Sequence, residues 1–489
     1  MLALTIWPEP VLGRPWLQRG VSAHQAHSYE TEQCHMSLRQ ILREATGFLG
    51  SKLSTLLYHG RSVLCPSCCE RIYPGACAIV SLAELQSQSL ATLVPLRESP
   101  RGLRRFFSIL FPTSLMSEQF TRKQAVRICP HCQYPLPYNI ERTRQVTIAI
   151  IGDVSSGKSV YIAVLLRLLE QGAFLPRDLP AKLPCLTPEA RERYERDYGK
   201  PLFIDRMVPR GTPRAIDTTH QPIIYEIGLR LEPDLPPVRF NLVIYDTSGE
   251  DYVIQARQVQ YAPYVLNADA IIFMLDPVAI PQMRASLPND PHFRYGHNLA
   301  LGHPLDSFSK IVQPLVQARA RRPRPLAITL SKADLLKKLR PVGQQYGFLK
   351  RAPDYSGGLD LNDLASVDQE VRQLLYEYDL GRFLATVEFY QGQLFAPVCY
   401  TAVSALGYTP DEQGSIPTVS PWRCLDPFLW VLHELGLLPA RARSASGLGP
   451  ALHGSATVQT PAFPLTPAYP VTPATPWQGA QPGQRLNWP

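Results

Sequence analysis

Residues 145 to 159 read Gln-Val-Thr-Ile-Ala-Ile-Ile-Gly-Asp-Val-Ser-Ser-Gly-Lys-Ser. The apolar, β-branched run from Val146 to Ile151 predicts a short buried strand, which ends at Gly152. From Val160 to Glu170 the apolar residues recur with the period of a helix. The spacing between strand and helix is G-x-x-x-x-G-K-S, so this stretch predicts the strand, loop and helix of a P-loop.

The residue types in this loop suit the binding of phosphate. Gly152 and Gly157 let the backbone come close to an anion, so that N–H groups and the helix N-terminus face it. Lys158 would reach the β- and γ-phosphates of a nucleotide, and the Ser159 hydroxyl would ligate Mg²⁺. The alternative is a glycine- and serine-rich turn that merely precedes a helix. The predicted nucleotide-binding residues of this stretch are Gly152, Asp153, Val154, Ser155, Ser156, Gly157, Lys158, Ser159 and Val160.

A second apolar run, Val238 to Tyr245, predicts another buried strand and leads into Asp246-Thr-Ser-Gly249-Glu250-Asp251. An aspartate at the end of a strand beside the P-loop strand is placed to hold Mg²⁺ through water. The N–H group of Gly249 can donate to the γ-phosphate, which would make the following segment sensitive to that phosphate. Asp246 and Gly249 therefore join the predicted site.

Selection of guanine is predicted where a later strand ends. Ala270 to Leu275 and Pro325 to Leu330 predict a third and a fourth apolar strand, and the fourth leads into Ser331-Lys332-Ala333-Asp334. The Asp334 carboxylate can accept from both N1–H and the exocyclic amine of guanine, while the Lys332 stem lies over the base. Adenine lacks this pair of donors, so the motif favours GTP over ATP.

A fifth predicted strand, Leu394 to Thr401, leads to Ser404, Ala405 and Leu406, which are placed to support the edge of the base. The four motifs in this order resemble the translation-factor and Ras-like (TRAFAC) class of P-loop GTPases, over roughly residues 144 to 438. The resemblance implies a three-layer α/β domain with a mixed sheet, GTP and GDP as ligands, Mg²⁺ as cofactor and hydrolysis of GTP to GDP and phosphate.

Two residues depart from the pattern of that class. Ser331 stands where the family usually has Asn or Thr. Glu250 stands where Ras-like members carry the glutamine that orients the attacking water. A carboxylate near the γ-phosphate adds repulsion, so we expect slow or partner-activated hydrolysis, with Asp251 as a candidate substitute. The predicted catalytic residues are Lys158, Gly249, Glu250 and Thr219.

The connection between the P-loop helix and the next predicted strand, Pro222 to Leu231, is long and includes a charged helical segment from Pro188 to Tyr198. The class needs a threonine just before this strand to bind Mg²⁺ and the γ-phosphate, and either Thr219 or Thr218 fits. Arg214 would either act as an arginine finger in cis or remain a solvated loop charge.

Two cysteine pairs precede the P-loop, Cys65-Pro-Ser-Cys68 and Cys129-Pro-His-Cys132. Each turn aims two thiolates at one point, and two such turns supply the tetrahedral sulfur set that structural Zn²⁺ prefers in a zinc ribbon. The roughly 60 residues between the pairs exceed the usual spacing of about 15 to 20, which predicts an insertion. Spare candidates, which we expect not to bind the metal, are Cys69, Cys77 and His131.

That insertion is basic, with aromatic residues interleaved, for example Arg104, Arg105, Phe106 and Phe107. Such a pattern suits nucleic acid or an acidic protein face, although a solvated face over a small core is commoner. The zinc-ribbon front and the long insertions further resemble bacterial double-GTPase proteins, which are found in multi-component conflict or defence systems.

Length and composition limit the classes of protein and the domain organisation that remain possible. The chain has 489 residues, a net charge of +8 and 48 prolines, many of them near its end. No run approaches the roughly 18 apolar residues of a membrane span and the N-terminus lacks a signal-peptide pattern, so we expect a cytoplasmic protein without membrane contact. We predict an N-terminal segment with an amphipathic helix (1–60), a zinc ribbon with an insertion (61–138), a GTPase domain (144–438) and a disordered tail (439–489).

The sequence therefore predicts a slow GTPase that acts as a conformational switch and signals to a protein partner through the segments near Thr219 and Gly249. The first alternative is a GTP-binding scaffold that does not turn over, which Glu250 favours. The second is a nucleic-acid-binding protein gated by GTP, which the basic insertion favours.

Overall fold

The structure, a computed structural model, describes residues 62–81, 125–141, 143–153, 155–172, 185–209, 222–229, 238–245, 263–287, 303–318, 322–339, 341–355, 358–411 and 413–439. All of these residues belong to the first of the two units into which the chain divides, Met1–Arg441. The amphipathic helix predicted within 1–60, the insertion over 82–124 and the tail beyond 439 lie outside the described residues. No helix in the described ranges is long and apolar enough to cross a membrane.

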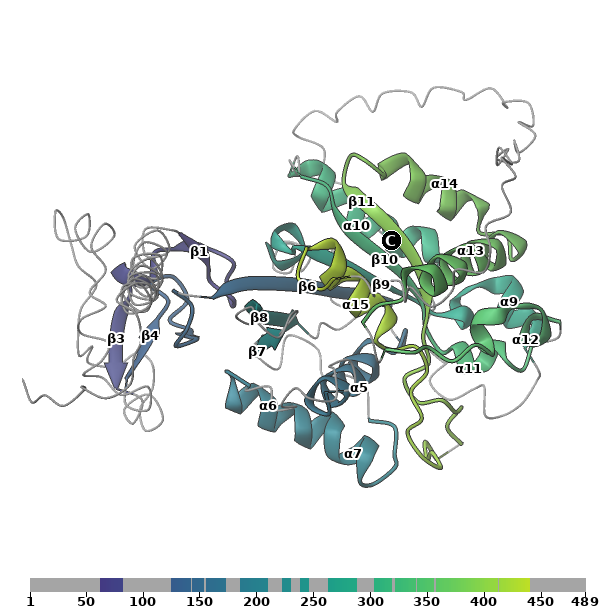
Figure 1. Ribbon diagram of the computed structural model, residues 1–489, viewed down its shortest axis with the longest axis horizontal. Coiled ribbons are helices and arrows are strands. Elements are labelled where there is room, and N and C mark those ends of the chain that lie inside the picture. The colour runs from purple at the N-terminus through teal and green to yellow at the C-terminus, as the bar shows by residue number, and fades with distance from the viewer. Residues whose placement is uncertain are drawn as a thin grey trace, which may run out of the picture. The chain divides into compact units, whose positions relative to one another are not determined.

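A six-stranded sheet forms the centre of the larger domain (Figure 1). Its strands lie in the order β11-β10-β9-β6-β8-β7, and neighbours are parallel except for β7 and β8, which are antiparallel. The strands are β6 (Arg144–Gly152), β7 (Ile223–Leu229), β8 (Val238–Tyr245), β9 (Ala270–Leu275), β10 (Arg324–Leu330) and β11 (Phe395–Ala402). The predicted mixed sheet is confirmed, with the P-loop strand at an inner position.

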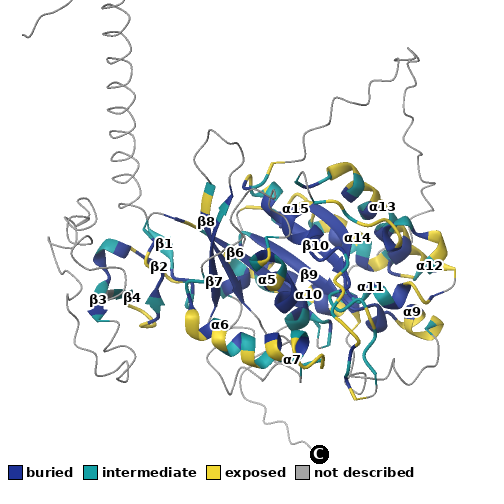
Figure 2. Ribbon diagram, turned by 60° about the horizontal axis from the view of Figure 1, so that its bottom comes forward, coloured by how far each residue is buried: buried dark blue, intermediate teal, exposed yellow. Residues whose placement is uncertain are grey.

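These strands form because their apolar side chains are buried from both sides. All six residues of β9 are buried, as expected of a parallel strand that is covered on both faces. Alternate side chains of β6 belong to two different apolar clusters, with Ile148 in one and Ala149 in the other. Figure 2 shows the buried strands at the centre, with the exposed residues mainly on the outer sides of the helices.

Two helical layers cover the two faces of the sheet. One apolar cluster includes residues of α5 (Lys158–Glu170), α6 (Pro188–Tyr194) and α15 (Asp426–Glu434). The other includes residues of α10 (Pro304–Gln317), α13 (Leu361–Glu377) and α14 (Gly381–Tyr390). The shorter elements are η3 (Glu195–Gly199), α7 (Lys200–Phe203), η5 (Pro277–Ala279), α9 (Pro281–Ser286), α11 (Ala333–Leu336), α12 (Val342–Gln345) and η7 (Gly347–Leu349). Three layers result, as predicted.

Residues 361–390, whose apolar residues recur with the period of a helix, form two helices, α13 and α14. Asp379 has a φ of 63°, and this left-handed residue lies between the end of α13 and the start of α14. Aspartate tolerates such an angle better than most residues, so the chain can turn there. The hydrophobic period alone does not locate this break.

The cysteine-containing region is built from two small sheets. The strands β1 (Val63–Leu64) and β2 (Arg71–Ile72) pair with each other, and η1 (Pro74–Ala76) follows them. The strands β3 (Ala78–Ser81), β4 (Ala125–Ile128) and β5 (Pro135–Leu136) form an antiparallel sheet. Ser81 pairs with Ala125, so the residues on either side of the insertion lie next to each other at one end of the β3–β4 pair.

This region packs against one face of β7 and β8. The side-chain amides of Asn139 and Asn241 exchange two hydrogen bonds of 2.9 and 2.7 Å, and both residues are buried. The Tyr138 hydroxyl donates to the Glu226 carboxylate at 2.7 Å. Apolar side chains from both parts belong to one buried cluster, so the cysteine-containing region is joined to the sheet by packing as well as by hydrogen bonds.

Candidate functional site

The P-loop turns sharply out of β6. Gly152 lies so close to β9 that a Cβ atom there would collide with the backbone carbonyl of Met274. Gly157 has a φ of 83° and directly precedes α5, and Ser155 has a φ of 64°. Glycine adopts such angles without steric strain, which lets the chain pass from strand to helix in a short loop.

The ammonium group of Lys158 lies over this loop. Lys158 is only 5% exposed, and its Nζ donates to the carbonyls of Gly152 and Asp153 at 2.9 and 2.6 Å and to the Ser156 hydroxyl at 3.3 Å. A phosphate oxygen carries a negative charge and a carbonyl oxygen does not, so a phosphate chain would attract this ammonium more strongly than its present acceptors do. The loop therefore has a pre-formed cation at the position that the motif assigns to it.

One loop contact comes from a residue that the sequence did not indicate. The hydroxyl of Ser307, on α10, donates to the Asp153 carboxylate. Ser159 and Val160 lie in the first turn of α5. Because α10 begins far along the chain, no local pattern around Ser307 could have identified this contact.

The residues predicted to read guanine meet at the ends of β10 and β11. The Ser331 hydroxyl donates to the Leu275 carbonyl at 3.1 Å, which ties the end of β10 to β9. The Ser404 hydroxyl donates to the Asp334 carboxylate at 2.6 Å, which fixes the orientation of that carboxylate. The structure thus brings Ser331, Asp334 and Ser404 together; their part in binding remains a prediction.

Asp276 is a second residue that the sequence analysis passed over, although it directly follows a predicted strand. Its side chain is fully buried, and its carboxylate accepts from Lys332 Nζ at 2.7 Å and from the backbone N–H of Val278 at 2.9 Å. Lys332 itself has a φ of 51°. The ion pair holds the lysine stem in one direction; that the stem covers a base remains a prediction.

The loop after β11 is closed by its own hydrogen bonds. Ser404 and Trp422 exchange two backbone hydrogen bonds of 3.0 and 2.8 Å, and the Gly407 N–H donates to the Ser404 hydroxyl at 2.9 Å. Gly407 has a φ of 82°, and a Cβ atom there would collide with the neighbouring backbone. Ala405 and Leu406 pack against the buried cluster, so all three predicted loop residues lie on a rigid turn.

The Arg423 side chain anchors the far end of this loop and is only 1% exposed. It forms ion pairs with Asp426 at 2.6 Å and with Asp363. Burial alone would raise the pKa of Asp363, but hydrogen bonds from Arg423 and Arg351 outweigh it and lower that pKa. The loop is therefore tied to α13 as well as to β11.

The residues predicted to sense the γ-phosphate lie outside the described residues. They are Arg214, Thr218, Thr219, Asp246, Gly249, Glu250 and Asp251, and Val154 of the predicted P-loop also lies outside the described residues. The neighbouring residue Tyr245 ends β8 and pairs with Ala149 of the P-loop strand. The Tyr245 hydroxyl lies 3.9 Å from the Cys69 sulfur, and its ring stacks on Tyr264.

The four predicted zinc ligands converge at one point. The sulfur atoms of Cys65, Cys68, Cys129 and Cys132 all lie within 4.8 Å of one another. The Cys65 and Cys132 sulfurs are 3.7 Å apart, and those of Cys68 and Cys129 are 3.8 Å apart. A tetrahedral site with Zn–S bonds of about 2.3 Å requires sulfur separations of about 3.8 Å, so the cluster fits Zn²⁺.

Each pair sits on a turn of the same construction. The N–H groups of Ser67 and His131 each donate to the sulfur of the cysteine two residues earlier, at 3.4 Å. The left-handed residues Cys69 and Gln133 end the two turns. The hydrogen bond between the Cys65 and Cys132 sulfurs raises the pKa of Cys65 and lowers the pKa of Cys132.

The spare candidates stay outside the cluster within the described residues. Cys77 is buried, and its thiol donates to the Tyr73 carbonyl at 3.5 Å. Cys69 faces Tyr245, and the backbone of His131 rather than its ring supports the cluster.

The fold and the ordered motifs define a P-loop GTPase. A family model described as Double-GTPase 2 matches residues 146–355. The chain is 30% identical over 329 residues to the "Putative ESX-1 scaffolding and assembly protein SaeC" of Mycolicibacterium smegmatis, covering 64% of this chain and 81% of that protein. The chain belongs to the Double-GTPase 2 family.

Solved structures with a similar arrangement have low sequence identity. The signal recognition particle receptor SRb-GTP/SRX complex from Chaetomium thermophilum is 15% identical, covers 55% of this chain and 95% of its own, and has a TM-score of 0.25. The bacterial selenocysteine-specific elongation factor EF-Sec is 13% identical, with 53% and 26% covered and a TM-score of 0.21. Sup35 complexed with GDP is 13% identical, with 55% and 39% covered and a TM-score of 0.21.

Proposed function

We propose that the protein binds GTP with Mg²⁺, hydrolyses it slowly and acts as a conformational switch for a protein partner. The observation that carries the proposal is the guanine end of the site. There the Asp334 carboxylate is held by Ser404 at 2.6 Å, and Lys332 is held by the buried Asp276 at 2.7 Å. A carboxylate fixed in this way would offer its acceptors to guanine with little further ordering when the nucleotide binds.

At the phosphate end, Lys158 and the N–H groups of the loop would bind the phosphate oxygens. Ser159, Asp246 and Thr219 would hold Mg²⁺, which would supply positive charge to the phosphates. Water would attack the γ-phosphate in line, and the N–H group of Gly249 would stabilise the charge that develops. Loss of that phosphate would release the segments near Thr219 and Gly249, which is the proposed signal.

Nucleotide binding by the purified protein tests this proposal directly. We expect GTP and GDP to bind with Mg²⁺ and ATP to bind much more weakly. Asp334→Asn replaces an acceptor by a donor, so it should lose affinity for GTP and gain affinity for XTP, whose base carries a carbonyl in place of the amine. Asp379→Asn is the matched control, because it makes the same exchange outside the site and asparagine also tolerates its left-handed backbone. Equal binding of GTP and ATP would refute the proposal.

A GTP-binding scaffold without turnover is the second candidate. Two observations favour it: Glu250 stands at the position of the water-orienting glutamine, and the Mycolicibacterium relative is named a scaffolding and assembly protein. Phosphate release measured over hours separates the two candidates, with Lys158→Ala giving the background. Release above that background supports the switch, and tight GTP binding without release supports the scaffold.

The relative's name also bears on the partner. We propose that the partner is a protein of a multi-component assembly such as a secretion machine, and that Zn²⁺ at the cysteine cluster is structural. A setting in a conflict or defence system remains a prediction, as do contacts of the insertion with nucleic acid.

A further inference from the structure

The segment between α5 and β7 packs closely on the P-loop helix. It consists of α6, η3 and α7, which follow one another without a break from Pro188 to Phe203. The middle turn, η3, is a π-helix, a form that is often found at functional sites.

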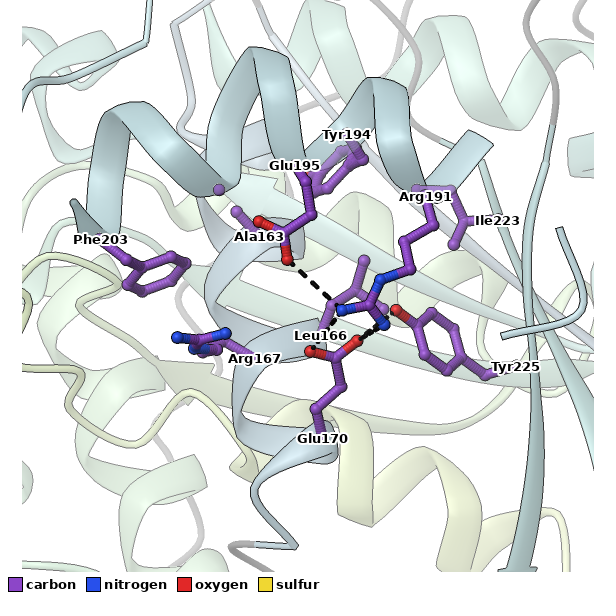
Figure 3. Close-up of a pocket in the computed structure, with 11 residues that line it drawn as sticks. Ala163, Leu166, Arg167, Glu170, Arg191, Tyr194, Glu195, Phe203, Ile223 and Tyr225 are labelled. Carbon is purple, nitrogen blue, oxygen red and sulfur yellow. Dashed lines mark hydrogen bonds and ion pairs between the residues drawn. The ribbon is translucent and has the colours of Figure 1, made fainter. Parts of the chain in front are cut away.

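An ion-pair network joins this segment to α5 and β7. Figure 3 shows Arg191 pointing from α6 toward Glu170 at the end of α5, with Glu195 on its other side. The Tyr225 hydroxyl of β7 donates to the same Glu170 carboxylate at 2.7 Å. The Arg167 guanidinium lies 5.3 Å from the centre of the Phe203 ring of α7. The segment is thus held along most of the length of α5.

The contact nearest the candidate site is made by Tyr194. Its hydroxyl donates to the backbone carbonyl of Ser159 at 2.6 Å. Tyr194 is 8% exposed, and its ring stacks on Tyr198 with 4.7 Å between the ring centres. The hydroxyl therefore reaches the first turn of α5 from a ring that is fixed by packing.

The chain that directly follows α7 reaches the loop after β11. The Val208 N–H donates to the Gly414 carbonyl at 2.7 Å, and the Ile416 N–H donates to the Arg206 carbonyl at 2.9 Å. One stretch of chain therefore contacts both the first turn of the P-loop helix and the loop that contains Ser404.

We infer that Tyr194 is a positioning residue for the Mg²⁺ end of the site. This inference rests on the proposed function, because it concerns the Ser159 hydroxyl as a metal ligand. The hydrogen bond to the Ser159 carbonyl fixes the backbone of the residue whose side chain must point at the metal. A ligand held in advance in this way gains affinity because less ordering is needed when the metal and phosphate bind.

Tyr194→Phe tests the inference, because it removes the hydroxyl and keeps the stacked ring. GDP affinity is measured with saturating Mg²⁺ and again in buffer freed of Mg²⁺, without a chelator that would also remove Zn²⁺ from the cysteine cluster. We expect about a fivefold loss with Mg²⁺, which is the size of one neutral hydrogen bond, and almost none without Mg²⁺. Tyr346→Phe is the matched control: its hydroxyl donates to Glu377 at 2.7 Å and it lies outside the site. Equal losses with and without Mg²⁺ would mean a merely structural role, and no loss in either would also overturn the inference.

A double-mutant cycle with Ser159→Ala sharpens the test. If Tyr194 acts through the Ser159 hydroxyl, Tyr194→Phe should have no further effect on GDP affinity in the Ser159→Ala protein. Additive losses would overturn the inference. The measurement without Mg²⁺ also reports whether each variant is folded. Wild-type protein that binds no guanine nucleotide would refute the proposed function, whereas Mg²⁺-dependent binding that Tyr194→Phe leaves unchanged would refute only the positioning role.

Discussion

The antiparallel pair β7–β8 carries an added structure on each face, and the two are attached by different chemistry. The cysteine-containing region is joined to one face by the buried Asn139–Asn241 amide pair and by apolar packing. The segment α6–α7 is joined to the other face through a network that centres on the ion pair of Arg191 and Glu170. A buried neutral pair is insensitive to salt, whereas a partly exposed ion pair is screened by it.

Both additions also reach the phosphate end of the candidate site. The cysteine region contacts Tyr245, the residue before Asp246, through Cys69. The segment α6–α7 contacts Ser159 through Tyr194. The two supports of this end can therefore be weakened separately. Loss of the metal or of the amide pair weakens the cysteine region, whereas high salt or removal of a charge weakens the attachment of α6–α7.

The largest expected effect is loss of the metal. Cys129→Ser removes one of the four sulfur ligands, so zinc content should fall from about one per chain to nearly none. Structural zinc contributes on the order of 10 kcal/mol in small zinc-binding peptides, so we expect the cysteine region to unfold. Metal analysis and limited proteolysis measure both. Cys77→Ser is the control, because a hydroxyl can still donate to Tyr73; equal zinc loss in both variants would contradict the assignment of ligands.

The amide pair should come next. Asn139→Ala leaves the fully buried Asn241 amide without its partner, which should lower the free energy of unfolding by about 2 kcal/mol, with little dependence on salt. Asn267→Ala removes an exposed amide that donates to Pro263 and should change stability little. Urea unfolding provides the measurement. Recovery of stability in the Asn139→Leu, Asn241→Leu double variant would support the role of the pair, because no unpaired amide remains.

The ion pair should contribute less. The Arg191 side chain is 37% exposed, so Arg191→Met should lower the free energy of unfolding by only about 1 kcal/mol at low salt, and by less at high salt. Arg191→Lys keeps the charge and serves as the control. Urea unfolding at two salt concentrations tests this expectation. A loss that does not depend on salt would remove the difference between the two faces.

The smallest effect is expected at the contact between Cys69 and Tyr245. Their atoms are 3.9 Å apart, and a thiol is a weak hydrogen-bonding group, so Tyr245→Phe should lower the free energy of unfolding by about 0.5 kcal/mol. Zinc content should stay unchanged, which metal analysis checks in the same sample. A loss as large as that of Asn139→Ala would show that this contact holds the two parts together as strongly as the amide pair does.

The central strands could be predicted because each one is a continuous apolar run bounded by glycine or polar residues. Strands β8 and β9 have the predicted bounds, and the motifs follow their ends. The four cysteines could be predicted as a set because each pair carries its own tight turn. These features are local. Burial of a strand and the geometry of a tight turn each restrict the residue types at neighbouring positions, so they leave a pattern in the sequence.

The contacts that shape the site could not be predicted, because each joins residues far apart in the chain. Asn139 and Asn241 are 102 residues apart, Asp276 and Lys332 are 56 apart, and Ser159 and Tyr194 are 35 apart. A single polar side chain leaves no periodic pattern that names its partner. The sequence by itself determines the strands, the phosphate loop and the metal-binding turns. Which polar side chains pair with one another is decided only by the tertiary structure, because packing brings residues from distant parts of the chain into contact.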